Sequence, residues 1–269
     1  MIARLTTAAV GIPLLVLVVW AGEPWFAMAV AGLAAIGAVE VCRMARNRGM
    51  TPSQTSAAVL TLALVGSHYV YSTDVSTPGF TLQGLIAALV VVAASFYSVK
   101  SFGPMKPRSW GLTIGAALYP GGLLAHAPLL RDLDQGLEWV VFLLIVTFST
   151  DTAAFFVGKA IGKRPLAPKI SPNKTWEGAI GGFLGAIVAA TLAAMALDLD
   201  SGMATILILG ALMGVVGQVG DLFESRLKRI ANVKDSGGLF PGHGGVLDRL
   251  DSIVFNLVLV YYFVIWGVQ

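Results

Sequence analysis

The segment from Asp221 to Asp251 carries the densest chemistry in the sequence. Its 31 residues include four aspartates, one glutamate, five basic residues and one histidine. Asp221 ends one apolar run and Asp248 begins the next, so the two carboxylates are predicted to approach from opposite helix ends. Two carboxylates among lysines and arginines suit a Mg²⁺ ion that is bound jointly by protein and substrate phosphates. The segment therefore predicts phosphate chemistry.

The residues that follow Asp221 support this interpretation. Glu224, Ser225 and Lys228 stand at i+3, i+4 and i+7, so they share one helical face with Asp221. A glycine-rich stretch over residues 234–245 then precedes the next helix. Such backbone can direct several N–H groups onto a phosphate.

A second polar segment, residues 171–178, reads Ser-Pro-Asn-Lys-Thr-Trp-Glu-Gly and leads into an apolar run. A helix N-terminus attracts anions, Lys174 adds a mobile cation, and Ser171 and Thr175 add hydrogen-bond donors. The segment thus predicts a phosphate contact. The alternative is that Ser171 or Asn173 caps the helix and that Lys174 is an ordinary lysine near the membrane.

Asp151 lies about six residues inside the end of an apolar run, or roughly 9 Å deep. An ionised carboxylate at that depth usually faces a polar cavity or a charged partner. Asp151 is therefore either a functional residue or the acid of a buried pair with a lysine from a neighbouring loop.

The elements that position these residues are predicted to be membrane-spanning helices. Of 269 residues, 56% are hydrophobic and only 12% are charged, which excludes a soluble domain and a disordered chain. Cys42 is the single cysteine, which excludes a disulfide framework. The apolar runs are continuous rather than alternating, so we expect an all-α polytopic bundle and not a β-barrel.

Nine spans are predicted, and the first is expected to be a retained helix rather than a signal peptide. Their approximate bounds are 5–22, 26–42, 56–71, 80–98, 109–130, 138–157, 177–197, 203–221 and 246–268. With the N-terminus inside and the C-terminus outside, 17 of the 18 basic residues fall in cytoplasmic segments, and Arg131 is the exception. This asymmetry also explains the net charge of +3, so it indicates no nucleic acid partner.

We expect residues 1–135 to form a scaffold of five spans and residues 136–269 to form the catalytic region. In the scaffold, Glu40 is expected to extend to the membrane surface beside Arg43, and residues 120–122 (Pro-Gly-Gly) are expected to interrupt the fifth span. In the seventh span, two overlapping G-x-x-x-G pairs over residues 178–185 predict close helix packing.

The two polar segments resemble the phosphatidate cytidylyltransferase family, the CDP-diacylglycerol synthases. The family signature matches over 27 residues without a departure, at Ser225, Leu227-Lys228-Arg229, Lys234-Asp235, Gly237, Phe240-Pro241, His243-Gly244-Gly245, Asp248-Arg249 and Asp251. Residues 171–178 and 151–155 are similar to two further segments of the family. The resemblance covers roughly residues 140–269.

The resemblance implies transfer of CMP from CTP to phosphatidic acid. We expect this reaction at the cytoplasmic face of the cell (inner) membrane, because CTP arrives through water and the lipid arrives laterally. The resemblance also implies a homodimer, a Mg²⁺ requirement and a second, monovalent cation such as K⁺. Asp221 and Asp248 would be the metal ligands. We expect Lys228, Arg229 and Lys234 to act as catalytic cations, with substrate bound by Asp151, Ser171, Asn173, Lys174, Thr175, Glu177, Ser225, Asp235, His243, Gly244, Gly245, Arg249 and Asp251.

Three other functions are alternatives to this one. A related CTP-dependent enzyme could act on a polyprenol or an ether lipid, but the intact signature favours phosphatidate. A cation-coupled transporter would place its acids near the bilayer midplane, whereas these acids gather at one face. A CDP-alcohol phosphotransferase is disfavoured because its Asp-Gly-x-x-Ala-Arg run is missing.

Overall fold

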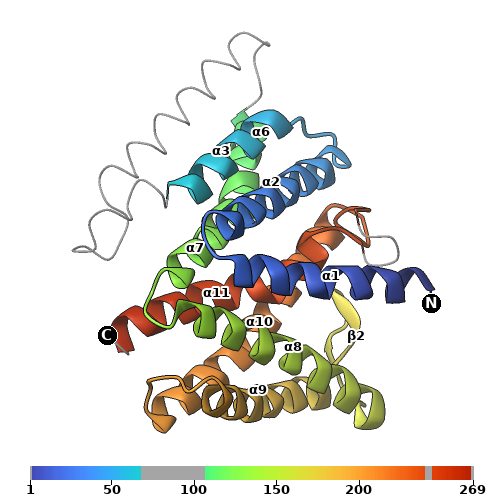
Figure 1. The fold of residues 1–269 in the computed structure, drawn as a ribbon. Helices are drawn as coiled ribbons and strands as arrows, with labels where there is room; N and C mark the ends of the chain where they lie inside the picture. The colour runs from blue at the N-terminus through green and yellow to red at the C-terminus, as the bar shows by residue number, and fades with distance from the viewer. Residues whose placement is uncertain (1, 68–106, 240–243, 268–269) are drawn as a thin grey trace. The chain divides into compact units, whose positions relative to one another are not determined.

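The computed structural model describes residues 2–67, 107–239 and 244–267, and these residues are predominantly helical (Figure 1). The helices are α1 (Ile2–Ala21), α2 (Trp25–Arg46), α3 (Gln54–Gly66), α6 (Pro107–Ala117), the π-helical turn η1 (Leu118–Gly122), α7 (His126–Arg131), α8 (Gly136–Ile161), α9 (Trp176–Ala196), α10 (Met203–Ile230) and α11 (Leu247–Gly267). Two short strands, β1 (Pro165–Ala167) and β2 (Ser171–Thr175), form an antiparallel pair between α8 and α9.

Five helices, α2 and α8 to α11, are long and apolar enough to cross a membrane. They coincide with five of the predicted spans, which confirms a helical membrane protein. The predicted span at 80–98 lies outside the described residues. The count of nine spans and the N-in, C-out orientation stay predictions.

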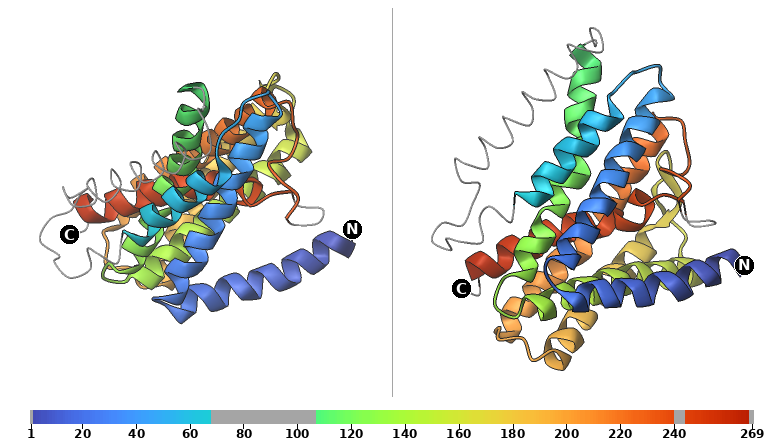
Figure 2. Two further views of the ribbon diagram at one scale, coloured as in Figure 1. Left: turned by 90° about the horizontal axis from the view of Figure 1, so that it is seen from above. Right: turned by 45° about the horizontal axis from the view of Figure 1, so that its top comes forward.

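The chain divides into two compact units. Unit 1 comprises residues 1–129 and 231–248, and unit 2 comprises residues 130–230 and 249–269. In unit 1, α2 and α3 lie side by side in both views of Figure 2, and α6 and η1 pack against both. Small buried residues at these contacts let the helices approach closely: Ala38, Cys42, Ala57 and Ala116.

The predicted interruption of the fifth span is confirmed. Regular helix gives way to η1 at Leu118–Gly122, and the chain resumes as α7 at His126. Proline at position 120 lacks a backbone N–H, so the regular hydrogen-bond ladder cannot run through it.

In unit 2, α8 and α9 pack closely along the glycines of α9 (Figure 1). A Cβ atom added at Gly178 would lie 2.8 Å from the carbonyl oxygen of Ala154, and one added at Gly182 would lie 3.0 Å from the Ala154 Cβ. No larger side chain fits at such distances, so the predicted role of these glycines in packing is confirmed.

One predicted boundary is wrong, and the alternative in which Ser171 or Asn173 caps the seventh span is also wrong. Helix α10 does not end at Asp221 but continues to Ile230, because residues 222–230 contain neither glycine nor proline and place Glu224 four residues before Lys228. Residues 171–175 form strand β2 rather than the start of a helix. Helix α9 begins at Trp176, and the Thr175 side chain caps it by accepting the N–H of Gly178 at 3.1 Å.

Candidate active site

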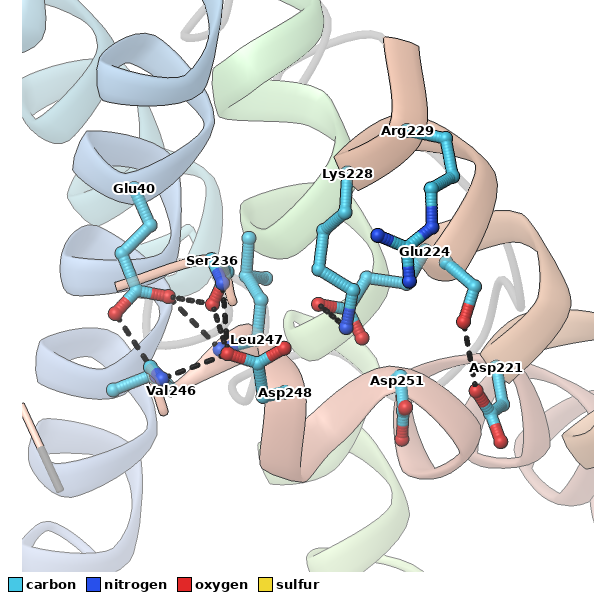
Figure 3. A network of polar contacts seen from close by, with 12 residues as sticks. Glu40, Asp221, Glu224, Lys228, Arg229, Ser236, Val246, Leu247, Asp248 and Asp251 are labelled. Atoms are coloured by element: carbon cyan, nitrogen blue, oxygen red, sulfur yellow. Dashed lines mark hydrogen bonds and ion pairs between the residues drawn. The ribbon is translucent and has the colours of Figure 1, made fainter. Parts of the chain in front are cut away.

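In unit 1, three donors converge on one oxygen of Asp248, at the first turn of α11. The Oδ2 atom accepts the N–H of Ser236 at 2.8 Å, the N–H of Gly245 at 2.8 Å and the Ser236 hydroxyl at 2.9 Å (Figure 3). The carboxylate thereby joins the two ends of the glycine-rich segment. Its orientation is fixed by neutral hydrogen bonds.

A second carboxylate, that of Glu40 on α2, lies in the same group. Its Oε1 atom accepts the N–H of Val246 at 2.9 Å, and its Oε2 atom accepts the N–H of Leu247 at 3.0 Å and the Ser236 hydroxyl at 2.8 Å (Figure 3). Glu40 is only 2% exposed. The prediction that this side chain extends to the membrane surface beside Arg43 is therefore wrong, because it caps the N-terminus of another helix.

The sequence contains a signal for the buried role of Glu40. Glu40 lies six residues before the end of an apolar helix, which is the same depth argument that singled out Asp151. Its partner, the segment 236–247, is some 200 positions away in sequence, so no local pattern connects the two.

The glycines of the segment fit around these two carboxylates. A Cβ atom at Gly237 or Gly245 would touch the carboxylate of Glu40, and one at Gly244 would touch that of Asp248. Gly244 also has a φ of +83°, which glycine adopts without strain. The backbone N–H groups that could have faced a phosphate, those of Gly245, Val246 and Leu247, donate here to the protein's own acids.

In unit 2, Lys174 forms an ion pair with Asp221. The two side chains are 28% and 26% exposed, so both are in reach of solvent. The Ser225 hydroxyl donates to the Oδ1 atom of Asp221 at 3.3 Å (Figure 3). The structure thus brings together two segments that the sequence presents separately, residues 171–178 and the signature.

Further along α10, Lys228 and Glu224 form a buried ion pair at 3.3 Å, and their side chains are 11% and 0% exposed (Figure 3). A carboxylate buried to this extent is stable only when it is paired. Glu224 therefore fixes the ammonium group of Lys228 on the helical face that the sequence predicted.

Asp151 of α8 lies in the electrostatic field of this group. The charges of Asp251 and Asp221 act on it, and those of Lys174 and Arg249 oppose them. Asp151 thus has charged neighbours of both signs. Asp151, Asp221 and Asp251 of unit 2 are therefore close enough for their charges to influence one another.

Several other predicted site residues make contacts that shape the loops. Glu177 accepts the N–H groups of Lys163 and Arg164 at 3.0 and 3.2 Å, and Arg229 donates its Nε–H to the carbonyl oxygen of Ile170 at 3.1 Å. Ser171 begins β2, where it pairs with Ala167. The exposed predicted residues are Asp151, Asn173, Arg229, Lys234, Asp235 and Arg249, and His243 lies outside the described residues.

The two predicted metal ligands belong to different units, Asp248 to unit 1 and Asp221 to unit 2. Within the described ranges, no group of three or more His, Cys, Asp or Glu side chains is arranged to hold a metal ion. Mg²⁺ often binds through one or two carboxylates and completes its shell with water and substrate phosphates, which fits the donors present. The joint site stays a prediction.

Comparison with known proteins gives the family context. The chain matches the model of the cytidylyltransferase family over residues 2–266. It is 34% identical over 265 residues to a protein of Bacillus subtilis (strain 168) named phosphatidate cytidylyltransferase, with 96% of each chain covered. Proteins of the same name from Synechocystis and Brucella suis are 34% and 45% identical, covering 97% and 58% of this chain and 96% and 57% of theirs.

Proposed function

The chain belongs to the cytidylyltransferase family of enzymes, and on this premise we propose that it transfers the CMP group of CTP to phosphatidic acid. The products are CDP-diacylglycerol and pyrophosphate. The observation that carries the proposal is similarity along nearly the whole chain to relatives named for this reaction, in Bacillus subtilis and in Synechocystis. The intact 27-residue signature agrees with it.

The proposed chemistry needs no strong general base. The attacking group is an oxygen of the lipid phosphate monoester, which is anionic at neutral pH. It forms a bond to the α-phosphorus of CTP while the bond to the departing pyrophosphate breaks in line. The protein then contributes mainly positioning and charge neutralisation.

The cations of unit 2 are suited to that neutralisation. Lys174 is paired with Asp221 but reaches solvent, so phosphate oxygens of a substrate can replace the carboxylate as its partner. Lys228 is held in place by Glu224. We assign the pyrophosphate or the lipid phosphate to Lys174, Lys228, Arg229 and Lys234.

We assign Mg²⁺ to Asp221 and Asp248. When bound, the ion supplies Lewis-acid neutralisation of the triphosphate. Once Lys174 turns to a phosphate, Asp221 has an oxygen to offer a cation. The second cation and the homodimer implied by the family resemblance are proposed with it.

We place the active site at the cytoplasmic face of the membrane. The distribution of basic residues favours this orientation. It is also the location that both substrates can reach, since CTP arrives through water and the lipid arrives laterally.

The test is release of pyrophosphate by the purified protein in detergent, with CTP and Mg²⁺. We expect release that depends on phosphatidic acid, with CDP-diacylglycerol as the lipid product identified by mass spectrometry. Diacylglycerol and a polyprenyl phosphate serve as control acceptors. Release with the polyprenyl phosphate and none with phosphatidic acid would replace this function by the related lipid-activating one.

A further inference from the structure

We propose that Glu40 is a positioning residue for the reaction, which acts by holding Ser236 and the first turn of α11 so that Asp248 presents its carboxylate in one orientation. The inference rests on the proposed function only for its kinetic readout. The geometry lies wholly within unit 1.

Glu40 caps the N-terminus of α11. Glu40 receives the N–H groups of Val246 and Leu247, one on each carboxylate oxygen. A negative charge at a helix N-terminus is favoured by the helix dipole and satisfies N–H groups that have no partner within the helix. The position at which α11 begins is therefore fixed by a side chain from α2.

The Ser236 hydroxyl joins Glu40 to Asp248. The Ser236 Oγ atom lies 2.8 Å from Glu40 Oε2 and 2.9 Å from Asp248 Oδ2. Both acids also receive backbone donors from the same short segment. A change at Glu40 is thus transmitted to Asp248 through Ser236 and through the backbone of residues 245–247.

Burial of the Glu40 carboxylate costs free energy. A carboxylate that is 2% exposed on an apolar helix is expensive to bury, and an apolar residue there would pack more cheaply. The glycines at 237 and 245 leave room for this acid and for no side chain of their own. The local structure is built to orient donors around a charge.

Glutamine cannot replace Glu40. Because each carboxylate oxygen accepts a backbone N–H, the amide NH₂ of Glu40→Gln would face the N–H of either Val246 or Leu247. The volume is unchanged, so the variant removes the hydrogen-bond match and keeps the packing. Asp134→Asn, an exposed acid in unit 2, is the matched control for loss of one carboxylate.

The experiment compares wild type, Glu40→Gln, Ser236→Ala, the double variant and Asp134→Asn in the pyrophosphate assay. We expect Glu40→Gln to lower kcat by about 10- to 100-fold, the range for loss of residues that orient a ligand, with the KM for CTP within threefold of wild type. If Glu40 acts through Ser236, the double variant is no worse than the poorer single variant. Asp134→Asn keeps wild-type kinetics.

Hydrogen exchange without metal or substrate gives a second readout. Glu40→Gln should speed exchange at residues 236–239 and 244–247 and leave α8 and α9 unchanged. A kcat within twofold of wild type, or effects of Glu40→Gln and Ser236→Ala that multiply, would overturn the inference. Should Glu40→Gln fail to fold, Ser236→Ala decides alone, because normal kcat there breaks the proposed link. Inactive wild type would instead refute the proposed function.

Discussion

The acids of the two units are held in opposite ways. In unit 1, Asp248 and Glu40 accept hydrogen bonds from neutral donors, mostly backbone N–H groups. In unit 2, Asp221 and Glu224 are paired with lysine side chains. Backbone donors cannot leave when a substrate arrives, whereas a lysine on a flexible stem can turn from a carboxylate to a phosphate. The acids of unit 1 are therefore held in a fixed orientation, whereas unit 2 contains an ion pair, Lys174–Asp221, that can exchange partners.

The difference extends within unit 2. The Lys174–Asp221 pair is about one quarter exposed, whereas the Lys228–Glu224 pair is almost fully buried. Exposed pairs contribute little to stability, and buried pairs are costly to break. We therefore expect Lys174 to exchange partners during turnover and Lys228 to remain with Glu224.

The largest expected effect breaks the buried pair. Glu224→Gln removes the buried carboxylate that is paired with the ammonium group of Lys228, which should lower the free energy of unfolding by about 3–5 kcal/mol. The Glu224→Gln/Lys228→Met variant should recover most of this loss, as measured by thermal unfolding in detergent. Equal stability of wild type and Glu224→Gln would show that the pair is not a fixed one.

Next come the predicted metal ligands. Asp221→Asn and Asp248→Asn should each lower kcat by at least ~10², because each removes a charge from a Lewis-acid site. Asp248→Asn retains an oxygen for the three donors, so its thermal stability should match wild type. Activity of either variant within threefold of wild type, at saturating Mg²⁺, would refute the assignment of that residue.

Alanine at the same positions sharpens the contrast between the units. Asp248→Ala leaves buried donors of Ser236 and Gly245 unsatisfied, which should cost about 1–3 kcal/mol of stability. Asp221→Ala releases a partly exposed lysine and should cost well under that. Equal losses in thermal unfolding would mean that the two acids are held alike.

A smaller effect is expected at Lys174. Lys174→Ala should lower kcat by at least ~30-fold if this lysine stabilises charge on the leaving pyrophosphate, a discounted form of the effect of an oxyanion donor. Steady-state kinetics with varied CTP measure it. A raised KM with normal kcat would make Lys174 a binding residue, and unchanged kinetics would reduce it to a partner of Asp221.

The smallest effect on activity is expected from two cysteine substitutions that test the membrane orientation by thiol labelling. Lys163 is exposed, and a Cβ atom at Gly238 meets no atom within 4 Å, so cysteines should be tolerated at both positions. In a Cys42→Ala background, we expect an impermeant thiol reagent to label Lys163→Cys and Gly238→Cys only from the cytoplasmic side, with activity retained. Labelling of either from outside intact cells would refute the predicted orientation.

The sequence predicted the features that depend on local composition. Apolar runs located the long helices, and Pro120 and the α9 glycines indicated the interruption and the close packing that are observed. It misplaced the end of α10, because hydropathy marks only the apolar part of a helix, and α10 continues as a polar helix to Ile230. It missed the role of Glu40, because the donors that hold this acid come from a segment some 200 residues away.

The length of α10 has a consequence for how the lipid is used. Its 28 residues make a helix about 42 Å long, against roughly 30 Å of hydrocarbon. With the membrane span at residues 203–221, as the sequence predicts, the two turns that carry Lys228 and Arg229 would lie at the height of the lipid headgroups. The proposed acceptor need not leave the bilayer, an extraction that would cost about 0.8 kcal/mol for each CH₂ group. Turnover should then follow the surface density of the acid lipid and fall when neutral lipid or detergent dilutes it at constant bulk concentration.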